Sequence, residues 1–258
     1  MSVFNVANLN KVYPGTSPVV ALKNISLKVE EGEFIVLLGP SGCGKSTLLE
    51  ILSGLQSATD GKVEFHGRPI NGPQPSLGVV FQDASLLPWR TIENNVELGL
   101  ELRGVPKEER RRAVAAHLAQ VGLGGFGEKY PHQLSGGMRQ RAGIARALAN
   151  DPEVLLMDEP FGAVDHITRI KLQEDLIRLW QEHRRTIVFV THDVGEAVFL
   201  ADRIVLLSPR PGRIHEIFEI NLPRPRKRGD LSLLKQEAAI YEVLHAVEEA
   251  ASQSPLVA

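Results

Sequence analysis

The chain has 258 residues, of which 43% are hydrophobic and 23% charged, and its formal net charge is −2. These values are typical of one globular domain with room for an insertion or a tail, and they exclude a general basic surface for nucleic acid. No apolar run is long enough to cross a bilayer, and the N-terminus does not resemble a signal peptide, so we expect a cytoplasmic protein. A single cysteine excludes an internal disulfide.

The first part of the chain, residues 3–29, has an imperfect alternation that predicts two half-buried strands in a hairpin-like region. Tyr13 is expected in the loop between these strands. Its ring could stack on an adenine through the π-face, and the alternative is a tyrosine that caps the sheet edge.

A phosphate-binding loop follows the apolar run 34–38, which predicts a buried strand. The loop matches G-x-x-x-x-G-K-[ST] in full, and leucines at helical spacing come after it. Glycines let backbone N–H groups converge on an anion, and the helix N-terminus adds partial positive charge. Lys45 provides a full charge for the β- and γ-phosphates, and the Ser46 hydroxyl is placed to bind Mg²⁺. The nucleotide-binding residues predicted here are Gly39, Pro40, Ser41, Gly42, Cys43, Gly44, Lys45, Ser46 and Thr47.

Cys43 in this loop has two interpretations. A helix N-terminus favours the thiolate, which would make the residue reactive. The alternative is a small side chain that fills a turn, and the sequence leaves both open.

Another apolar run, 77–81, predicts a buried strand that ends at Gln82, where an open α/β sheet presents ligand groups. The loop after it carries Leu86, Leu87 and Trp89 with little nearby to bury them. Exposed apolar side chains of this kind indicate a protein contact. The alternative is that Trp89 packs onto neighbouring helices.

Residues 91–121 have a helical pattern with a break at 104–106, and the arginines at 110–112 are expected on a solvated helix face. After a glycine-rich hinge at 122–127, a helix is predicted to start at 134–137 and to continue to Ala149. Its serine and glycines form a second helix start that can bind an anion.

The second half of the chain alternates strands and helices, which predicts a mostly parallel α/β core. The buried strand 154–157 ends in Asp158 and Glu159, and the buried strand 186–190 is followed by His192. Asp193 is expected to cap the next helix in a capping box with Glu196. Two further strands are predicted at 203–207 and 213–220.

The tail begins with a basic run, 223–228, and an amphipathic helix is predicted over 231–247. Such a run is usually a solvated linker. A contact with anionic lipid headgroups or with an acidic loop of a partner is the alternative.

Together these motifs resemble the ATP-binding cassette (ABC) ATPases over residues 3 to about 220. The most specific element is Leu134-Ser135-Gly136-Gly137, the ABC signature. The resemblance implies an α/β P-loop NTPase core with a mostly parallel sheet, an antiparallel β subdomain and an inserted α-helical subdomain that carries the signature. It gives a nucleotide-binding domain over 1–220, with the helical insertion at about 88–150, and a basic linker with a C-terminal helix over 221–258.

The resemblance also implies ATP and Mg²⁺ as cofactors and a role for each polar residue at the strand ends. Asp158 would hold Mg²⁺ through water, and Glu159 would act as general base for the attacking water. Gln82 resembles the glutamine that contacts Mg²⁺ and this water while it couples to the partner. His192 resembles the switch histidine that contacts the γ-phosphate, although a lone histidine at a strand end is more often structural.

The signature requires a second copy of the chain in a head-to-tail dimer, because it closes on the γ-phosphate held by the partner's loop. The residues from this side of the site are Ser135, Gly136, Gly137 and Asp165. Asp165 resembles the aspartate that links the two sites, although Gly162-Ala163-Val164 before it departs mildly from the family pattern. Whether the partner is identical or a paralogue is left open.

Residues 86–91, 94–96 and 207–214 resemble the nitrate/sulfonate/taurine branch of bacterial importers. This implies an integral membrane permease whose coupling helix binds at Gln82–Trp89, and a periplasmic or lipoprotein solute-binding protein. The chain would then be a peripheral protein on the cytoplasmic face of the inner membrane and would not bind nucleic acid. The alternative is a soluble ABC ATPase with a mechanical or assembly role, and the transported solute is left open.

Overall fold

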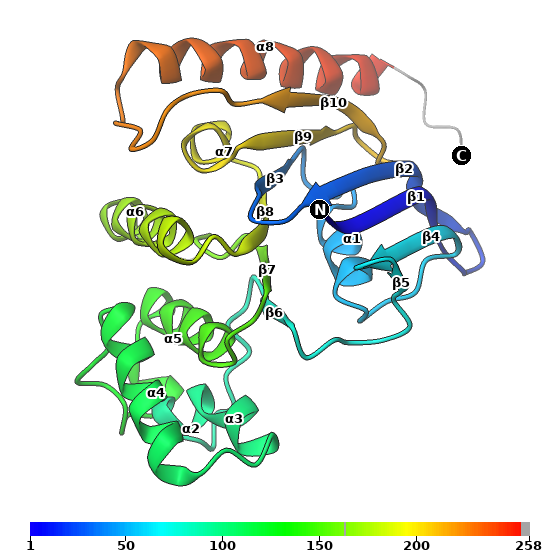
Figure 1. The fold of residues 1–258 in the computed structure, drawn as a ribbon. Coiled ribbons are helices and arrows are strands. Elements are labelled where there is room, and N and C mark those ends of the chain that lie inside the picture. Colours follow the sequence, from blue (N-terminus) through cyan, green and yellow to red (C-terminus); the bar gives the residue numbers. More distant parts are fainter. Residues whose placement is uncertain (163, 254–258) are drawn as a thin grey trace. The chain divides into compact units, whose positions relative to one another are not determined.

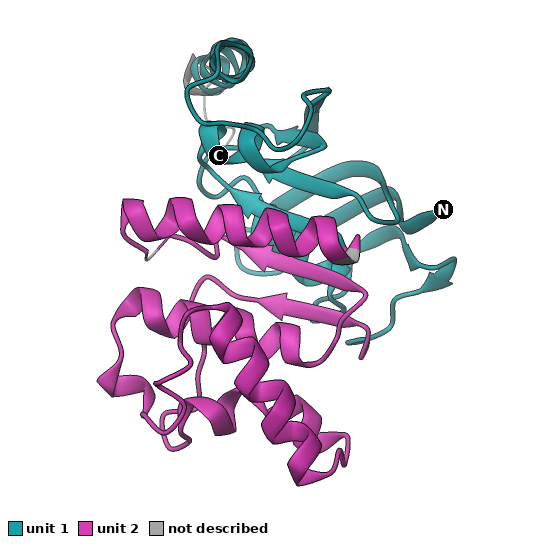
Figure 2. Cartoon of the chain, turned by 60° about the vertical axis from the view of Figure 1, so that its left-hand side comes forward, with its two compact units in different colours: residues 1–74, 186–258 teal, residues 75–185 magenta. Residues whose placement is uncertain are grey.

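The computed structural model describes residues 1–162 and 164–253, which form two compact units. Unit 1 comprises residues 1–74 and 186–258, and unit 2 comprises residues 75–185 (Figure 2). The phosphate-binding loop and His192 belong to unit 1. The signature, Asp158 and Glu159 belong to unit 2, which also contains the helical insertion expected at about 88–150.

Unit 1 contains a four-stranded antiparallel sheet in the order β2-β1-β4-β5 (Figure 1). Its strands are β1 (Ser2–Tyr13), β2 (Val19–Glu30), β4 (Asp60–Phe65) and β5 (Arg68–Pro69). Phe4 lies opposite Val29 on one side and Phe65 on the other, so apolar side chains from three strands meet in the buried face. The hairpin predicted for residues 3–29 is confirmed.

The remaining strands of unit 1 surround β3 (Phe34–Leu38), in which every residue is buried. It pairs in parallel with β8 (Thr186–Thr191) and β9 (Arg203–Leu207), and β10 (Ile214–Glu219) pairs antiparallel with β9. A continuous apolar run is typical of a central parallel strand, whose two faces are both covered. The helices of unit 1 are α1 (Lys45–Leu52), α7 (Val194–Leu200) and α8 (Leu231–Gln253).

Unit 2 contains two parallel strands, β6 (Leu77–Val80) and β7 (Val154–Asp158). Its helices are α2 (Ile92–Val96), α3 (Leu98–Leu102), α4 (Lys107–Gln120), α5 (Gly136–Ala149) and α6 (His166–His183), with a short 3₁₀ helix η1 (Pro131–Gln133). The predicted break at 104–106 separates α3 from α4. In the part of the chain that the structure describes, no helix is long and apolar enough to span a membrane.

Two expectations about basic runs are wrong in part. Arg110 of the 110–112 run is not solvated, because it forms an ion pair of 3.0 Å with Glu97 and donates to the Val105 carbonyl. In the 223–228 run, Arg226 is only 9% exposed and donates to several backbone carbonyls. The sequence pattern of these runs shows charge but not the carbonyls and carboxylates that the fold brings to them.

The part of the loop between β6 and α2 that contains Trp89 is held by the buried side chain of Asn95. Its Oδ1 accepts from the Leu87 N–H at 2.7 Å, and its Nδ2 donates to the carbonyls of Leu87, Arg90 and Thr91 at 2.9–3.1 Å. The amide therefore satisfies backbone groups of the loop that contains Trp89. A loop with its own buried anchor presents its apolar side chains from a defined backbone.

We predict that Asn95→Ala lowers the free energy of unfolding by about 2–3 kcal/mol, because it leaves buried backbone groups of the loop without partners. Urea unfolding followed by circular dichroism measures the change. Asn94→Ala is the matched control, since the Asn94 side chain is only half-buried and this variant should change stability by less than about 1 kcal/mol. Equal effects of the two substitutions would contradict the role of Asn95.

Candidate functional site

The phosphate-binding loop leads from β3 into α1, and two of its glycines have backbone conformations that other residues rarely adopt. Gly44, the N-cap of α1, has φ 103°, and a Cβ on it would lie 2.6 Å from Leu22 Cδ2. Gly39 has φ 153°, and its Cβ would lie 2.8 Å from the Leu207 carbonyl oxygen. The loop therefore depends on glycine at both positions.

Lys45, the first residue of α1, is 4% exposed although it carries a charge. Its Nζ donates to the carbonyls of Gly39 at 2.7 Å and Pro40 at 2.9 Å. The ammonium group thus lies over the concave side of its own loop, where it is compensated by backbone oxygens. Ser46 is exposed next to it. A cation and a helix N-terminus at one place provide an anion site suited to phosphate.

Tyr13 is the last residue of β1, whereas the sequence predicted it in a loop. Its hydroxyl donates to Gln56 Oε1 at 3.0 Å and lies 3.3 Å from Thr47 Oγ1. Lys11 Nζ lies 5.1 Å from the centre of the ring. The structure thus places the tyrosine beside the first turn of α1, as a nucleotide-stacking role requires. Stacking on adenine remains a prediction.

Cys43 is 1% exposed, and its Sγ lies 3.8 Å from Lys45 Nζ. Burial raises the pKa of the Cys43 thiol, and the nearby Lys45 charge offsets this only in part. The stabilised thiolate expected for a helix N-terminus is therefore not what this environment provides. The structure favours the second interpretation, in which a small side chain fills the turn.

Sequence reasoning missed the support that residues 209–212 give to this loop. A Cβ on Gly212 would lie 2.0 Å from the Cys43 carbonyl oxygen, and the Gly212 N–H donates to the Ala21 carbonyl at 2.9 Å. The Arg210 side chain lies near the same loop, because a Cβ added to Gly42 would be 3.7 Å from Arg210 Nη2. The sequence pattern of these residues indicates only membership of a family branch. The Pro-Gly pair at 211–212, a few residues after a buried strand, is the available signal for a tight approach.

His192 is exposed directly after β8. The capping box predicted between Asp193 and Glu196 forms only in part. Asp193 Oδ1 accepts from the Glu196 N–H at 2.9 Å, but the Asp193 N–H donates to Thr191 Oγ1 at 3.1 Å, and Thr191 Oγ1 donates to the Glu196 carboxylate. The threonine hydroxyl thus occupies the place that the glutamate would take in a capping box.

In unit 2 the signature begins α5. Ser135 is the N-cap, exposed, and its Oγ accepts from the Met138 N–H at 3.3 Å. Gly136 and Gly137 form the first turn, as predicted. Gln82 is exposed two residues after the end of β6, and Gln140 of α5 holds the preceding residue, because its Nε2 donates to the Phe81 carbonyl at 2.9 Å. Gln140 was not recognised from the sequence.

Three acidic residues of unit 2 lie where a strand or a loop ends. Asp158 is the last residue of β7, and Glu159 after it has φ 41°. This left-handed conformation is uncommon for glutamate and is often found at functional sites. Asp165 caps α6, and hydrogen bonds from the Thr168 backbone and side chain lower the pKa of Asp165, which keeps it ionised at neutral pH. Ala163, named in the sequence analysis, lies outside the described residues.

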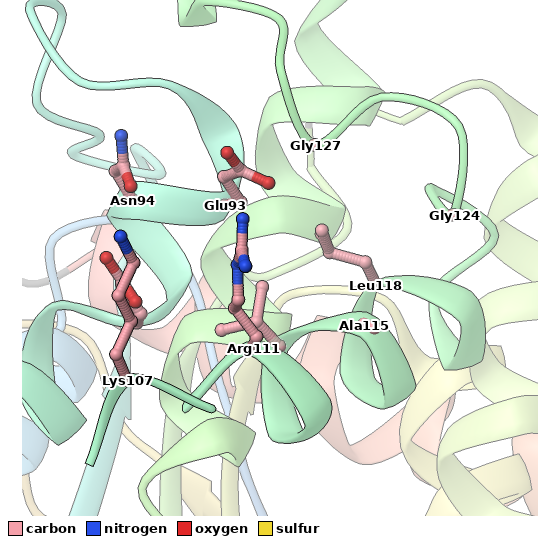
Figure 3. Close-up of a pocket in the computed structure, with 10 residues that line it drawn as sticks. Glu93, Asn94, Lys107, Arg111, Ala115, Leu118, Gly124 and Gly127 are labelled. Carbon is pink, nitrogen blue, oxygen red and sulfur yellow. The ribbon is translucent and has the colours of Figure 1, made fainter. Parts of the chain in front are cut away.

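Trp89 is 71% exposed, and Leu86 and Leu87 are half-buried. The alternative in which Trp89 packs onto neighbouring helices is therefore wrong. The same unit contains a hollow of about 260 Å³ between α2 and α4 (Figure 3). Glu93, Lys107 and Arg111 give it charges of both signs, and Leu118 contributes an apolar wall.

Unit 1 thus brings Tyr13 and the phosphate-binding loop together and places His192 at the end of β8. Unit 2 carries Gln82, Asp158 and the remaining predicted residues. These are Ser135, Gly136, Gly137, Glu159 and Asp165. The N-terminus of α1 in unit 1 and the N-terminus of α5 in unit 2 both carry residues suited to binding phosphate.

We predict slow alkylation of Cys43 in the folded protein, at least about 10-fold slower than after unfolding in guanidinium, because the thiol is buried and its thiolate disfavoured. Mass spectrometry after timed exposure to iodoacetamide at pH 8 measures the rate. Since Cys43 is the only cysteine, modified protein reports on this site alone. Equal rates in the folded and unfolded states would contradict the burial of the thiol.

Comparisons with known proteins identify the family. The ABC transporter family model matches residues 22–162. An uncharacterized ABC transporter ATP-binding protein of Methanocaldococcus jannaschii is 52% identical over 240 residues, which cover 93% of this chain and 90% of that protein. The taurine import ATP-binding protein TauB of Yersinia pestis is 46% identical over 228 residues, 88% of each chain. The bicarbonate transport ATP-binding protein CmpC of Synechococcus elongatus is 52% identical over 237 residues, which cover 90% of this chain and 36% of CmpC.

A solved structure shows the same fold. The dimeric post-hydrolysis state of the ATP-binding cassette MJ0796, bound to ADP and Pi, has a TM-score of 0.78 and 36% identity. It covers 85% of this chain and 100% of its own. The expected α/β P-loop NTPase fold is confirmed. The chain belongs to the ABC transporter family, as a subunit that binds and hydrolyses ATP.

Proposed function

We propose that this ABC ATPase energises the uptake of a small anionic or zwitterionic solute, of the nitrate, sulfonate or taurine kind, through a separate membrane permease. The observation that carries the proposal is a complete phosphate-binding loop with its lysine in place, in a chain that resembles the ATP-binding proteins of taurine and bicarbonate transporters. A periplasmic or lipoprotein solute-binding protein would deliver the solute. The chain itself would attach to the cytoplasmic face of the inner membrane through the permease. No observation favours the alternative mechanical role.

In the proposed site, ATP stacks its base on Tyr13 and places its phosphates in the loop 39–47. Lys45 and the backbone N–H groups at the start of α1 compensate the charge of the phosphates. The donor set fits Mg²⁺, because this ion takes oxygen ligands and is usually held by one or two carboxylates together with phosphates and waters. Ser46, Gln82 and Asp158 would provide the protein oxygens. When bound, Mg²⁺ would neutralise charge on the β- and γ-phosphates.

Hydrolysis in this proposal needs a positioned water, and Glu159 is the residue assigned to orient it and accept its proton. Its left-handed backbone turns the chain sharply after Asp158, so adjacent carboxylates can have different tasks. His192 donates a hydrogen bond toward the γ-phosphate without a second permanent charge. Gln82 contacts the water and reports the state of the site to the permease-facing loop that follows it.

The signature half of the site would come from a second copy in a head-to-tail dimer. Ser135 and the first turn of α5 present a hydroxyl and backbone N–H groups for the partner's γ-phosphate. The dimeric state of the solved cassette MJ0796 supports this arrangement. Loss of the γ-phosphate removes the contact that differs between the closed and open dimers, so hydrolysis would release the two copies.

The permease would bind at Gln82–Trp89 through its cytoplasmic coupling helix. The exposed Trp89 and the half-buried Leu86 and Leu87 provide apolar contact area on a backbone held by Asn95. An aromatic anchor of this kind is common at the centre of a protein interface.

We predict that Glu159→Gln lowers the ATPase rate by about 10²–10⁴-fold and traps an ATP-bound dimer, because binding is kept and the base is lost. Phosphate release and light scattering with MgATP measure the two effects. Glu182→Gln on α6 is the matched control, since Glu182 is exposed and away from the proposed site residues. Rapid hydrolysis by Glu159→Gln would reject Glu159 as the base.

We predict that Trp89→Ala keeps nucleotide binding and basal ATP hydrolysis but loses association with the permease and transport. Co-purification with the co-expressed permease and solute uptake into membrane vesicles measure the loss. Leu102→Ala is the matched control, because Leu102 is 79% exposed in the same unit and lies outside the proposed contact. Loss of nucleotide binding in Trp89→Ala, or equal transport by both variants, would contradict the docking site.

A further inference from the structure

Helix α7 begins two residues after His192, and residues from the C-terminal segment 221–253 lie against both of its ends. This segment follows the last strand of the sheet and contains the arginine run and α8 (Figure 1). Both α7 and the segment belong to unit 1.

The C-terminal end of α7 is closed by arginine side chains. Arg226 Nη1 donates to the carbonyls of Val198 at 2.8 Å, Phe199 at 3.1 Å and Ala201 at 2.7 Å. Arg224 Nη2 donates to the Leu200 carbonyl, and the Ala201 N–H donates to the Ala197 carbonyl. Every carbonyl from 197 to 201 therefore has a donor, although the last four carbonyls of a helix have no partner within it.

Arg226 makes these contacts from inside the protein. It is 9% exposed, and its Nη2 also donates to the Ile220 carbonyl at 3.0 Å and the Leu222 carbonyl at 3.2 Å. Burial, with a smaller effect of the Arg224 charge, lowers the pKa of Arg226 to about 10, so the guanidinium still carries its proton at neutral pH. A permanent cation at a helix C-terminus is stabilising, and only a guanidinium has enough donors for all these carbonyls.

The N-terminal end of α7 faces α8, whose buried side consists of Leu233, Ile240, Leu244 and Val247. A Cβ on Gly195 would lie 3.3 Å from Asp193 Oδ1 and 3.6 Å from Glu237 Oε1. The carboxylate of Glu237 on α8 and that of Asp193, the N-cap of α7, therefore lie beside the same glycine. Partial burial raises the pKa of Glu237, and the nearby Asp193 charge raises it further.

The start of α7 is joined by hydrogen bonds to the turn that contains His192. Thr191 Oγ1 accepts from the Asp193 N–H and donates to the Glu196 carboxylate, which is buried in the first turn of α7. Asp193 Oδ1 accepts from the Glu196 N–H. Thr191 and Asp193 flank His192, so a displacement of α7 along its axis moves the backbone that carries the imidazole.

We infer that Arg226, together with Arg224 and α8, positions His192 by clamping α7 at both ends. This rests on the proposed role of His192 at the γ-phosphate. Arg224 and Arg226 of the basic run are then part of the catalytic geometry and not of a surface for lipids. Because a misplacement of about 1 Å can cost up to 10²-fold in rate, a helix held at both ends is a strong constraint on hydrolysis.

The test is Arg226→Gln in the full chain, with Lys227→Gln as the matched control because Lys227 is the exposed neighbour in the same run. We expect Arg226→Gln to lower kcat at saturating MgATP by about 10-fold and to leave KM for ATP within about twofold, since the phosphate-binding loop is untouched. Arg226→Lys keeps the charge and should restore kcat only in part, because an ammonium has fewer donors in a different geometry.

A spectroscopic measurement separates positioning from a general loss of structure. The chain has eight histidines, and the imidazole NMR signals of His192 are assigned as those lost in His192→Ala. Arg226→Gln should shift the His192 signals and leave those of the other histidines in place, and Lys227→Gln should shift none. Unchanged His192 signals and wild-type kcat in folded Arg226→Gln would overturn the inference.

Arg224→Gln, which removes the donor to the Leu200 carbonyl at the end of α7, keeps the test decisive if Arg226→Gln does not fold. Arg224 is only half-buried, so this variant should fold, and it should shift the His192 signals and lower kcat. No shift would overturn the inference. Wild-type kcat in His192→Ala would instead reject the proposed role of His192, while the signal shift in Arg226→Gln would still report whether the clamp positions it.

Discussion

The close approach of three backbone segments at the phosphate-binding loop is the constraint on which the rest of the structure depends. Gly44 lies against β2, Gly39 against the end of β9, and Gly212 against the carbonyl of Cys43. A Cβ at any of these positions would overlap a neighbouring atom. Because the segments come from distant parts of the chain, the shape of the loop and the packing of unit 1 depend on each other. The buried Lys45 belongs to the same constraint, since its ammonium is compensated by carbonyls of that loop.

The sequence predicted the parts of the site whose chemistry is local. A phosphate-binding loop needs its glycines, lysine and serine at set spacings between one strand and one helix, so the pattern at 39–47 contains most of its geometry. The start of α5 at Ser135 and the cap of α6 at Asp165 are equally local. Runs such as 34–38 and 186–190 were recognisable as buried parallel strands because both of their faces are apolar.

The features that the sequence did not reveal depend on partners far along the chain. Burial of the Cys43 side chain raises its pKa, and no pattern near Cys43 shows that burial. Arg226 resembled a solvated charge because its carbonyl partners at the end of α7 lie more than twenty residues away in sequence. The Thr191 hydroxyl replaced the expected capping-box contact of Glu196 for a similar reason, since the end of β8 brings it beside α7.

The two helix starts that carry phosphate-binding residues differ in a way that suits different tasks. Helix α1 begins at a glycine with no side-chain cap, so its first N–H groups are reserved for a ligand. Helix α5 begins at Ser135, whose Oγ already accepts from the Met138 N–H. A hydroxyl that accepts in this way still has its own proton to donate, so α5 can exist as a capped helix without a phosphate and add one donor when a phosphate arrives. In the proposed dimer, the first start would bind the nucleotide both before and after hydrolysis, and the second only while the γ-phosphate is present.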